Sequence, residues 1–401
     1  MLKLARKFLP QSLVNYFWHL PKAIFANCIY GFPSRRLKVI GVTGTDGKTT
    51  TTNMIYQILR DAGKKVSMVS TINAAIGGRV YDTGFHVTSP DPMMVQEFAR
   101  KALDNEDEYI VLEVTSHGLD QFRFWGIKFL VGVITNITHE HMNYHKTFEN
   151  YKNTKLKLIE NVKYAVVNYN LEILKQVQDD KSIKTFGLDK GDFNQKKEKL
   201  DLEIPGEYNI ENALAALVVS SVVGINQNQA KRALENFEGL TGRMEKVPNK
   251  KNLNIYIDFA HTPNGLENAL ETLRSHMKSG KLIALIGCEG FRDVGKREMM
   301  GEISGRLADI TIVTSVDPRG QLELINKQII KGLEKAGAKK DMDYFVVDDR
   351  KEAIKFGIEL AKKGDTVGIF GKGHETSMNL NGNSEIAWSE KETVMKVLKH
   401  G

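Results

Sequence analysis

The sequence Gly41-Val-Thr-Gly44-Thr-Asp-Gly47-Lys48-Thr49-Thr50 stands between an apolar run and a helical pattern, and it is the most informative segment of the chain. Its glycines let backbone N–H groups approach phosphate oxygens, and the N-terminus of the following helix adds a favourable dipole. Lys48 can reach the terminal phosphates of a nucleotide, and the Thr49 hydroxyl can ligate Mg²⁺. The strict P-loop has a glycine where this chain has Val42. The segment therefore predicts a P-loop-like turn that binds phosphate.

Strand-like and helix-like segments alternate after this turn. Apolar runs typical of buried strands occupy residues 37–43, 65–70, 109–113, 130–135 and 164–168, and after Gly242 residues 255–258, 281–287, 310–314, 344–347 and 366–370. Helical patterns in the first half cover residues 49–62, 91–103 and 147–160. Such alternation indicates an α/β fold with a mostly parallel sheet. We expect a P-loop-like central ATPase domain and a C-terminal Rossmann-like α/β domain.

The expected domain limits follow from this pattern. Residues 1–36 form an N-terminal arm, residues 37–241 the central ATP-binding domain, and residues 242–401 the C-terminal domain. The polar segment 189–199 is expected to be a surface loop. The two cysteines, Cys28 and Cys288, are too few for a disulfide framework or a cysteine zinc site, which favours a reducing, cytoplasmic compartment.

Positive charge is concentrated at the N-terminus. Of the 56 Lys and Arg residues, seven fall within the first 40 positions, which hold no Asp or Glu, so the rest of the chain balances 49 basic against 49 acidic residues. The formal charge of +7 therefore belongs to the arm. A nucleic-acid-binding body is the least favoured class of function, because the body is neutral and carries no recognised binding motif.

The arm contains no apolar stretch of the roughly 20 residues needed to span a bilayer. Two short helices split at Pro21 are expected, with five aromatic residues available for burial: Phe8, Phe17, Trp18, Phe25 and Tyr30. Docking of these aromatics on the body is slightly favoured. The alternative is a basic, aromatic segment that lies on an anionic membrane surface, which would place the protein at the inner face of the membrane.

Two further clusters follow predicted strands. Glu113 ends an apolar strand, and the carboxyl ends of strands are where α/β proteins bind ligands, so Glu113 is a candidate Mg²⁺ ligand. His139, His141 and His145 lie within seven residues, but their spacing fits no standard zinc pattern and no cysteine is near. Chemistry alone leaves the role of this histidine cluster open.

Together these segments resemble the Mur ligase family. The resemblance rests on residues 41–50 and 113–117, on 135–145 and 151–155, and on Gly206-Glu-Tyr-Asn209-Ile-Glu-Asn212 and Gly242-Arg243-Met-Glu245, in the family's order. The C-terminal half is similar to the UDP-N-acetylmuramoyl-tripeptide synthetase (MurE-type) branch of that family. That similarity rests on Asp258-Phe-Ala-His261-Thr-Pro263, Gly290-Phe-Arg292-Asp293-Val-Gly-Lys296-Arg297, Asp317-Pro318-Arg319 and Gly371-Lys372-Gly373-His374-Glu375.

The resemblance implies ATP-driven amide formation through an acyl phosphate, in which meso-diaminopimelate or lysine is added to a muramoyl-peptide precursor of peptidoglycan. It implies four catalytic residues: Lys48, Glu113, His141 and Lys155. Thr49 and Glu113 match ligands of a first Mg²⁺ ion and His141 matches a ligand of a second, while Lys155 matches a lysine that the family carbamylates. The residues expected to contact ATP are Gly44, Thr45, Asp46, Gly47, Lys48, Thr49, Thr50, Asn209, Asn212, Arg243 and Asp258.

Substrate contacts are implied in the same way. The positions matched to the muramoyl peptide are Thr88, Ser89, Thr115, Gln121 and Arg123, and those matched to the amino-acid acceptor are Arg292, Asp317, Pro318, Arg319, Gly371 and Glu375. An arginine after the proline grips the second carboxylate of diaminopimelate in relatives, so Arg319 favours a diaminopimelate-like acceptor. For Asn209 alone, helix capping is an equally good explanation.

Several departures keep alternatives open. Only some 36 residues precede the first strand, whereas family members carry a UDP-binding domain at that place. Both a UDP-linked donor and a lipid-linked donor therefore stay open. Phe291 and Asp317 change the acceptor motif, and Glu140 and Asn143 replace usual Asp residues. The alternatives are a ligase acting on a lipid-linked cell-wall precursor, a folylpolyglutamate synthetase, and a non-catalytic nucleotide-binding regulator. A monomer is expected.

Overall fold

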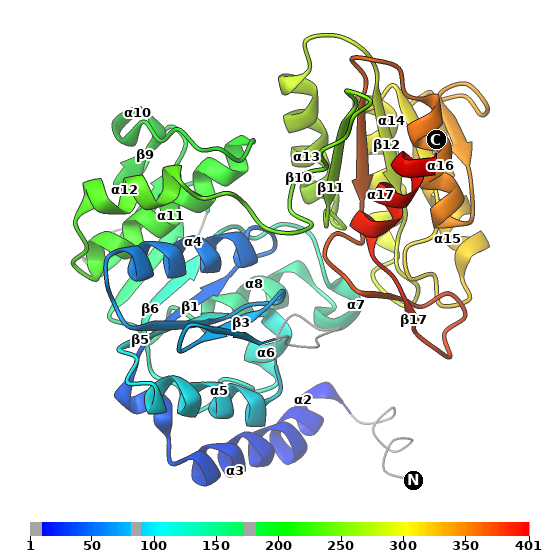
Figure 1. Cartoon of the computed structure of the whole chain (residues 1–401). Helices are drawn as coiled ribbons and strands as arrows, with labels where there is room; N and C mark the ends of the chain where they lie inside the picture. Colours follow the sequence, from blue (N-terminus) through cyan, green and yellow to red (C-terminus); the bar gives the residue numbers. More distant parts are fainter. Residues whose placement is uncertain (1–9, 82–89, 172–181, 401) are drawn as a thin grey trace. The chain divides into compact units, whose positions relative to one another are not determined.

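The computed structural model describes residues 10–81, 90–171 and 182–400 (Figure 1). These residues divide into two compact units. Unit 1 comprises the residues up to 137 together with 147–203 and 207–237, and unit 2 comprises residues 138–146, 204–206 and those from 238 onward. Each unit contains its own mostly parallel sheet, which confirms the predicted α/β fold.

Unit 1 is built on a nine-stranded sheet of order β4-β3-β2-β5-β1-β6-β7-β8-β9. Its strands are β1 (Lys38–Thr43), β2 (Val66–Val69), β3 (Ala74–Ile76), β4 (Arg79–Tyr81), β5 (Tyr109–Glu113), β6 (Phe129–Ile134), β7 (Tyr164–Asn168), β8 (Ile183–Gly187) and β9 (Phe193–Asn194). Among the described strands of this sheet, only the β2–β3 and β3–β4 pairs are antiparallel. Every residue of β5 is buried, as expected for a central strand covered on both faces.

Helices cover both faces of this sheet. They are α4 (Lys48–Asp61), α5 (Pro92–Asp104), α6 (Ser116–Asp120), α8 (Phe148–Leu156), α10 (Gln195–Glu198), α11 (Glu207–Val222) and α12 (Gln227–Glu235). On one face α4 packs against α11 and α12, and α5 lies on the other (Figure 1). The segment 189–199, expected to be a loop, contains β9 and α10. Asn194 explains the helix, because its side chain caps α10 by accepting from Lys197 N–H.

The described part of the arm packs on unit 1 as one helical segment. It consists of α2 (Gln11–Val14), the π-helical turn η1 (Asn15–His19) and α3 (Leu20–Tyr30), followed by the 3₁₀ turn η2 (Pro33–Arg36). Helix α3 packs against α5. The expected split at Pro21 is wrong: Pro21 lies in the first turn of α3, where its missing N–H is tolerated, and the irregular turn precedes it.

Most of the aromatic residues that the sequence suggested for docking do not dock. Phe17 is 78% exposed and Phe25 is 60% exposed, Trp18 is also exposed, and Tyr30 is partly buried. The buried residues of the segment are small or polar: Asn15, Ala23, Ala26 and Asn27. Phe8 lies outside the described residues.

Unit 2 is built on a six-stranded sheet of order β10-β11-β15-β12-β13-β14, in which only β10 is antiparallel. Its strands are β10 (Glu245–Lys246), β11 (Asn254–Asp258), β12 (Leu282–Ile286), β13 (Ile310–Val313), β14 (Tyr344–Val346) and β15 (Thr366–Phe370), and β16 (Ser377–Met378) and β17 (Ile386–Ala387) form a separate hairpin. Its helices are α7 (Met142–His145), α13 (Pro263–His276), α14 (Gly295–Leu307), α15 (Leu322–Lys335), α16 (Arg350–Leu360) and α17 (Glu390–His400).

The helices of unit 2 lie on both faces of its sheet. Residues of α16 and α17 join the strands in one apolar core, while α13, α14 and α15 pack together on the sheet's other side. Helices α14 and α15 cross at glycines. A Cβ on Gly301 would lie 2.0 Å from the carbonyl oxygen of Ile329, and a Cβ on Gly332 would lie 2.0 Å from that of Glu298. The two backbones therefore touch directly.

Candidate active site

The loop between β1 and α4 is held by the residues that follow β6. Thr45 N–H donates to the Asn136 carbonyl at 3.0 Å, and Asp46 N–H donates to Asn136 Oδ1 at 2.9 Å. Thr135 Oγ1 donates to the Asp46 carbonyl at 2.6 Å. These bonds fix the predicted phosphate loop at the carboxyl edge of the parallel sheet, where α/β proteins bind ligands.

Asn209 and Asn212 lie beside this loop on α11, and both are buried. Gly47 has a φ of 81°, and a Cβ there would lie 2.2 Å from Asn212 Oδ1. Thr51 Oγ1 donates to the same oxygen at 3.1 Å. Asn209 is the third residue of α11, so the capping interpretation of Asn209 is wrong. The two asparagines are three residues apart and so share a helix face, and Asn212 Nδ2 donates to Asn209 Oδ1 at 3.4 Å.

Two lysine side chains meet the carbonyl of Gly44. Lys48 Nζ donates to the carbonyl oxygens of Gly44 at 3.1 Å and of Thr45 at 2.7 Å. Lys155 Nζ donates to the Gly44 carbonyl at 2.5 Å and lies 4.6 Å from the ring centre of Tyr151. Lys155 is only 1% exposed, so it is not an ordinary solvated lysine of a surface helix.

Thr49 and Glu113 form a buried pair at the end of the loop. Thr49 Oγ1 donates to Glu113 Oε2 at 3.0 Å, and Thr71 N–H donates to the same oxygen at 2.8 Å. The other oxygen of Glu113, Oε1, is buried and makes no hydrogen bond within the described residues. Glu113 is 2% exposed, and a buried carboxylate oxygen without a donor is costly. This hydroxyl and carboxylate fit Mg²⁺, which prefers oxygen ligands.

The residues matched to the muramoyl peptide lie in and after α6. Thr115 caps this helix by accepting from Gly118 N–H at 3.0 Å. The Arg123 guanidinium donates to Gln121 Oε1 through Nε at 3.1 Å and through a terminal nitrogen at 2.7 Å. Thr88 and Ser89 lie outside the described residues.

The histidine segment 138–146 belongs to unit 2. Glu140 is buried there, and its Oε1 lies 3.2 Å from the buried Lys296 Nζ. Asp293 Oδ2 accepts from Met142 N–H at 3.3 Å. Within the described residues, no group of three possible metal ligands that includes a histidine lies close enough together to bind a metal ion. His141 has a φ of 60°, a strained conformation typical of functional positions.

Arg243 and Asp258 organise the end of β11. Asp258 accepts from Met244 N–H at 2.6 Å and from Ala260 N–H at 2.7 Å, which ties residues 242–245 to the strand. The Arg243 guanidinium lies 4.5 Å from the ring centre of Phe259. This pair presents a flat, cationic and aromatic surface of a kind that suits a nucleotide.

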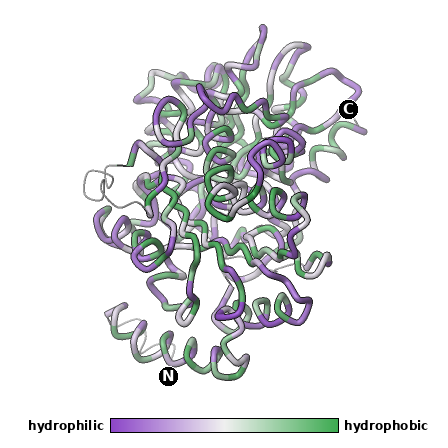
Figure 2. The backbone as a smooth tube through the Cα atoms, turned by 90° about the vertical axis from the view of Figure 1, so that its left-hand side faces the viewer, coloured by the Kyte–Doolittle hydropathy of each residue, from purple (hydrophilic) through white to green (hydrophobic). Residues whose placement is uncertain are grey.

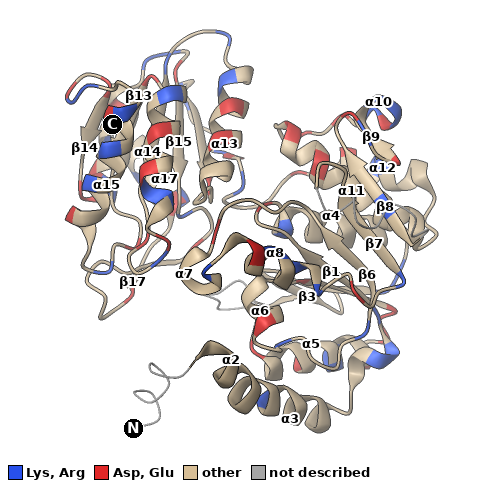
Figure 3. Cartoon of the chain, turned by 180° about the vertical axis from the view of Figure 1, so that it is seen from behind, with Lys and Arg blue, Asp and Glu red and all other residues tan. Residues whose placement is uncertain are grey.

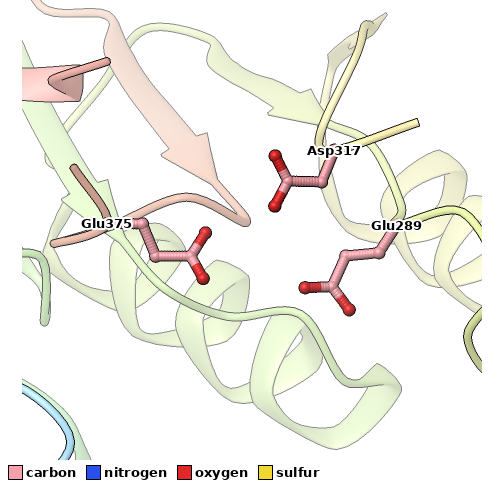
Figure 4. Close-up of side chains that lie close together, drawn as sticks. All are labelled: Glu289, Asp317 and Glu375. Atoms are coloured by element: carbon pink, nitrogen blue, oxygen red, sulfur yellow. The ribbon is translucent and has the colours of Figure 1, made fainter. Parts of the chain in front are cut away.

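Three acidic residues converge at the carboxyl edge of the unit 2 sheet, in the loops that follow β12, β13 and β15 (Figure 4). Carboxylate oxygens of Glu289, Asp317 and Glu375 lie within 4.8 Å of one another. The first two loops are joined by the Gly290 N–H, which donates to the Asp317 carbonyl at 2.9 Å. The predicted acceptor residues Asp317 and Glu375 are therefore neighbours, and Gly371 begins the third loop.

Two cations balance this acidic cluster. Lys372 Nζ is buried, lies 3.1 Å from both carboxylate oxygens of Asp317 and contacts Glu375 Oε2 at 2.5 Å. Arg292 Nε lies 3.3 Å from Glu289 Oε2. Asp317 is thus neutralised by Lys372. The adjoining Pro318 is also buried, and Arg319 is partly exposed.

Glu289 and Glu375 ionise at different pH values. Burial alone would raise the pKa of Glu289, but the charges of Lys296 and Arg292 outweigh it and lower that pKa to about 2. Burial raises the pKa of Glu375 to about 7, although Lys372 opposes the shift. The cluster therefore holds one firmly ionised carboxylate beside one that titrates near neutrality.

His374 lies between these groups and the Phe259 ring. Its ring centre is 4.9 Å from that of Phe259. Burial and the positive charges of Arg243, Lys372 and His261 lower the pKa of His374 to about 3. This imidazole is therefore neutral at physiological pH.

Sequence reasoning named most of these groups and missed several partners. Glu289, Lys372, Lys296 and Thr71 were given no role, although each lies at or beside a strand end or in a quoted motif. The feature that could have identified them is their position near strand ends, where side chains from neighbouring loops come together.

Comparison with known proteins supports the arrangement. The model of the Mur ligase middle domain matches residues 42–220, and that of the Mur ligase, glutamate ligase domain matches residues 242–373. A UDP-N-acetylmuramoyl-L-alanyl-D-glutamate--2,6-diaminopimelate ligase of Clostridium botulinum is 38% identical over 403 residues, which cover 94% of this chain and 81% of that protein. The ligase of that name from Clostridium tetani is 39% identical over the same shares of both chains.

Solved structures agree on the fold. A structure of a UDP-N-acetylmuramoyl-L-alanyl-D-glutamate--2,6-diaminopimelate ligase has a TM-score of 0.59 and 27% identity, covering 91% of this chain and 78% of that one. A MurF structure from Acinetobacter baumannii has a TM-score of 0.69 and 18% identity, covering 94% and 81%. At that identity the second likeness concerns the fold alone.

Proposed function

The chain belongs to the Mur ligase family, and from this premise we propose that it is an ADP-forming ligase that adds a diamino acid to a muramoyl peptide during peptidoglycan synthesis. The single observation that carries the proposal is the buried Thr49–Glu113 pair at the end of a phosphate loop. We propose a cytoplasmic location, where ATP is available, and a monomeric chain.

In the proposed reaction a carboxylate of the donor attacks the terminal phosphorus of ATP, and ADP leaves. The acceptor amine then attacks the acyl phosphate, and inorganic phosphate leaves with formation of the amide. Mg²⁺, when bound, would screen the charge of the phosphates, and Thr49 and Glu113 would hold it. Lys48 would exchange its loop carbonyls for phosphate oxygens. We propose that His141 would be a ligand of a second Mg²⁺ ion, because the family resemblance matches it to that role.

Nucleotide contacts are proposed on both units. In unit 1 they are the backbone of Gly44, Thr45, Asp46, Gly47 and Thr50 and the amides of Asn209 and Asn212. In unit 2 they are Arg243, beside the Phe259 ring, and Asp258. Backbone N–H groups at a helix N-terminus favour phosphate, and a guanidinium over a ring suits a planar base or a ribose phosphate.

The acceptor is proposed to bind at the acidic cluster. Lys372 pairs with Asp317 and Glu375, and Arg292 pairs with Glu289, so the three carboxylates outnumber these two cations and would attract an ammonium group. Arg319 and Arg292 are the cations for carboxylates of the acceptor. A molecule with ammonium and carboxylate groups at both ends, such as meso-diaminopimelate, uses both sets, whereas lysine offers only one carboxylate. The C. botulinum and C. tetani relatives carry diaminopimelate in their names.

We propose that Lys155 is carbamylated in the active protein. Its ammonium is buried with a carbonyl and a ring, and a carbamate there would exchange a positive for a negative charge beside the phosphate loop. With ¹³C-labelled bicarbonate, we expect a carbamate signal in the ¹³C spectrum that the Lys155→Met variant lacks. The Lys152→Met variant, altered at a partly buried lysine of the same helix that pairs with Glu149, is the matched control. An identical spectrum for Lys155→Met would contradict the modification.

The test of function is phosphate release from ATP and Mg²⁺ with defined substrates. Donors are UDP-muramoyl-dipeptide and its lipid-linked counterpart, and acceptors are meso-diaminopimelate and lysine. We expect release only with a donor and an acceptor together, with diaminopimelate the better acceptor. Glu113→Gln should lower turnover about 100-fold or more, because one ligand of the ion is weakened.

Glu108→Gln is the matched control, since Glu108 forms only an exposed pair with Lys38 just before the same strand. Release with the lipid-linked donor alone would select the lipid-precursor alternative. ATP binding without release in any combination would overturn the ligase and favour the regulator.

A further inference from the structure

The arm segment 11–30 has an inner face that is already engaged with unit 1. Asn15 Nδ2 donates to Asp120 Oδ2 at 2.8 Å, and Asn27 Nδ2 donates to the Trp125 carbonyl at 2.8 Å. Lys22 Nζ lies 3.0 Å from Asp91 Oδ2. These contacts fix how the segment is rotated about its axis, and so they determine which side chains point away.

The π-helical turn η1 keeps one set of residues on the inner face of the segment and another set on its outer face. Side chains four apart drift by about 40° per step around a pure α-helix, and a wider turn reduces that drift. Asn15, Ala23 and Asn27 are accordingly buried, although they extend over more than three turns. Leu13, Phe17 and Phe25, spaced by multiples of four, are all exposed.

The outer face is strongly apolar. Its exposed members are Leu13, Phe17, Trp18, Ile24, Phe25 and Ile29, whereas the Tyr16 ring centre lies 5.3 Å from that of Phe122 in unit 1. They follow one another along α2, η1 and α3, a segment that the hydropathy colouring shows with much green (Figure 2). Isolated apolar side chains on a surface are ordinary, but a continuous row of large ones marks an interaction surface.

The arm contributes basic residues and no acidic ones of its own. Arg35 and Arg36 are exposed, whereas Lys22 is paired with Asp91 of unit 1. The first 40 residues contain seven Lys and Arg and no acidic residue. In the charge colouring α3 shows blue, and neither α2 nor α3 shows red (Figure 3). A partner that covers this face therefore carries negative charge beside an apolar surface.

We propose that the outer face of segment 11–30 binds the surface of an anionic lipid bilayer, with the helix lying in the plane of the interface. Aromatic rings enter the boundary between headgroups and acyl chains, while Arg35 and Arg36 meet anionic headgroups. A second copy of the chain is disfavoured as the occupant, because a symmetric contact would bring like charges together. No helix among the described residues is long and apolar enough to cross a membrane, and a surface contact needs none.

This inference stands apart from the proposed ligase activity and is tested without substrates. The full chain is sedimented with vesicles of phosphatidylcholine alone and with vesicles containing about 30% phosphatidylglycerol. We expect the chain to pellet with the anionic vesicles and to remain in solution with the neutral ones. Raising the salt from about 0.1 M to about 0.5 M should weaken binding several-fold, because it screens the arginines.

Two pairs of variants give the test its controls. Phe17→Ser/Phe25→Ser should weaken vesicle binding about tenfold or more, whereas Leu324→Ser/Met342→Ser, which removes exposed apolar side chains from unit 2, should not. Arg35→Gln/Arg36→Gln should weaken binding to anionic vesicles, whereas Lys339→Gln/Lys340→Gln should not. The four side chains at 17, 25, 324 and 342 are exposed, so circular dichroism should be unchanged.

Equal pelleting of the Phe17→Ser/Phe25→Ser variant and its control would overturn the proposal. Sedimentation velocity without lipid supplies the other decisive outcome. A dimer that Phe17→Ser/Phe25→Ser dissociates would show that the face binds a second copy, and the lipid proposal would be wrong.

Discussion

At the scale of single residues, Glu375 connects the fold to a measurable pH dependence. Its pKa of about 7 means that the carboxylate forms as the pH rises from 6 to 8. Only the ionised form attracts an ammonium group, so the KM for the acceptor should fall about tenfold over this range. Steady-state kinetics at saturating ATP and donor would measure it.

Glu375→Gln is the control for this titration, because the amide keeps the shape of the side chain and cannot ionise. The variant should show a high and nearly constant acceptor KM between pH 6 and 8. An unchanged slope in Glu375→Gln would assign the pH dependence to another group, and Glu375 would not bind the amine.

Residue types were easier to predict than residue surroundings. The loop and Glu113 could be named from their positions at strand ends, whereas the paired asparagines were named through the family resemblance. The burial of Lys155 could not, since it depends on the packing of α8 against a loop more than a hundred residues earlier. The partners Lys372 and Glu289 were missed for the same reason, because their neighbours come from separate loops.

At the scale of elements, α16 and α17 are joined by a buried ion pair. The Arg350 guanidinium contacts both Glu390 oxygens and the carbonyls of Ser315 and Phe370, and both charged side chains are 0% exposed. Removing one partner leaves a buried charge without its counter-charge. Arg350→Ala should therefore lower the free energy of unfolding by about 3–5 kcal/mol, measured by urea denaturation.

The exposed pair of Lys331 and Glu298 provides the comparison, at 2.7 Å between α15 and α14. Lys331→Ala should cost less than about 1 kcal/mol, because solvent screens an exposed pair. If Lys331→Ala and Arg350→Ala lowered the free energy of unfolding by similar amounts, the buried Arg350–Glu390 pair would contribute no more to stability than an exposed pair.

Elements with a long apolar run were predicted well, and short ones were not. The strands at 109–113, 164–168 and 366–370 have the bounds that the sequence predicted. The hairpin of β3 and β4 was missed, because strands of three residues leave too little periodicity to detect. In the arm, hydrogen bonds from Asn15 and Asn27 to unit 1 determine which face is buried. Hydrophobicity alone predicted that the opposite, aromatic face would be buried.

At the scale of the whole molecule, each unit has an apolar core of its own. All members of the main core of unit 2 lie between Val247 and Leu398. A fragment of residues 242–401 should therefore unfold cooperatively in urea when followed by circular dichroism. A gradual loss of signal without a transition would show that this core needs the rest of the chain.

The fragment lacks Glu140, the buried partner of Lys296. Lys296→Met should therefore cost less stability in the fragment than in the full chain, where it leaves Glu140 buried without this cation at a cost of about 3–5 kcal/mol. An equal cost in both would mean that Glu140 does not stabilise Lys296. The Arg350→Ala loss, by contrast, should be the same in both, because that pair lies wholly within the fragment.

The crossing of α14 and α15 at Gly301 and Gly332 has a consequence for what the acidic cluster can accept. Each helix begins within a few residues of an acceptor loop, at Gly295 and at Leu322. Because the two backbones already touch, the loops cannot be drawn closer, and any added methyl group would force them apart. The spacing of the two proposed acceptor loops therefore depends on two glycines outside the acidic cluster, and we expect a change at either glycine to alter the range of acceptors.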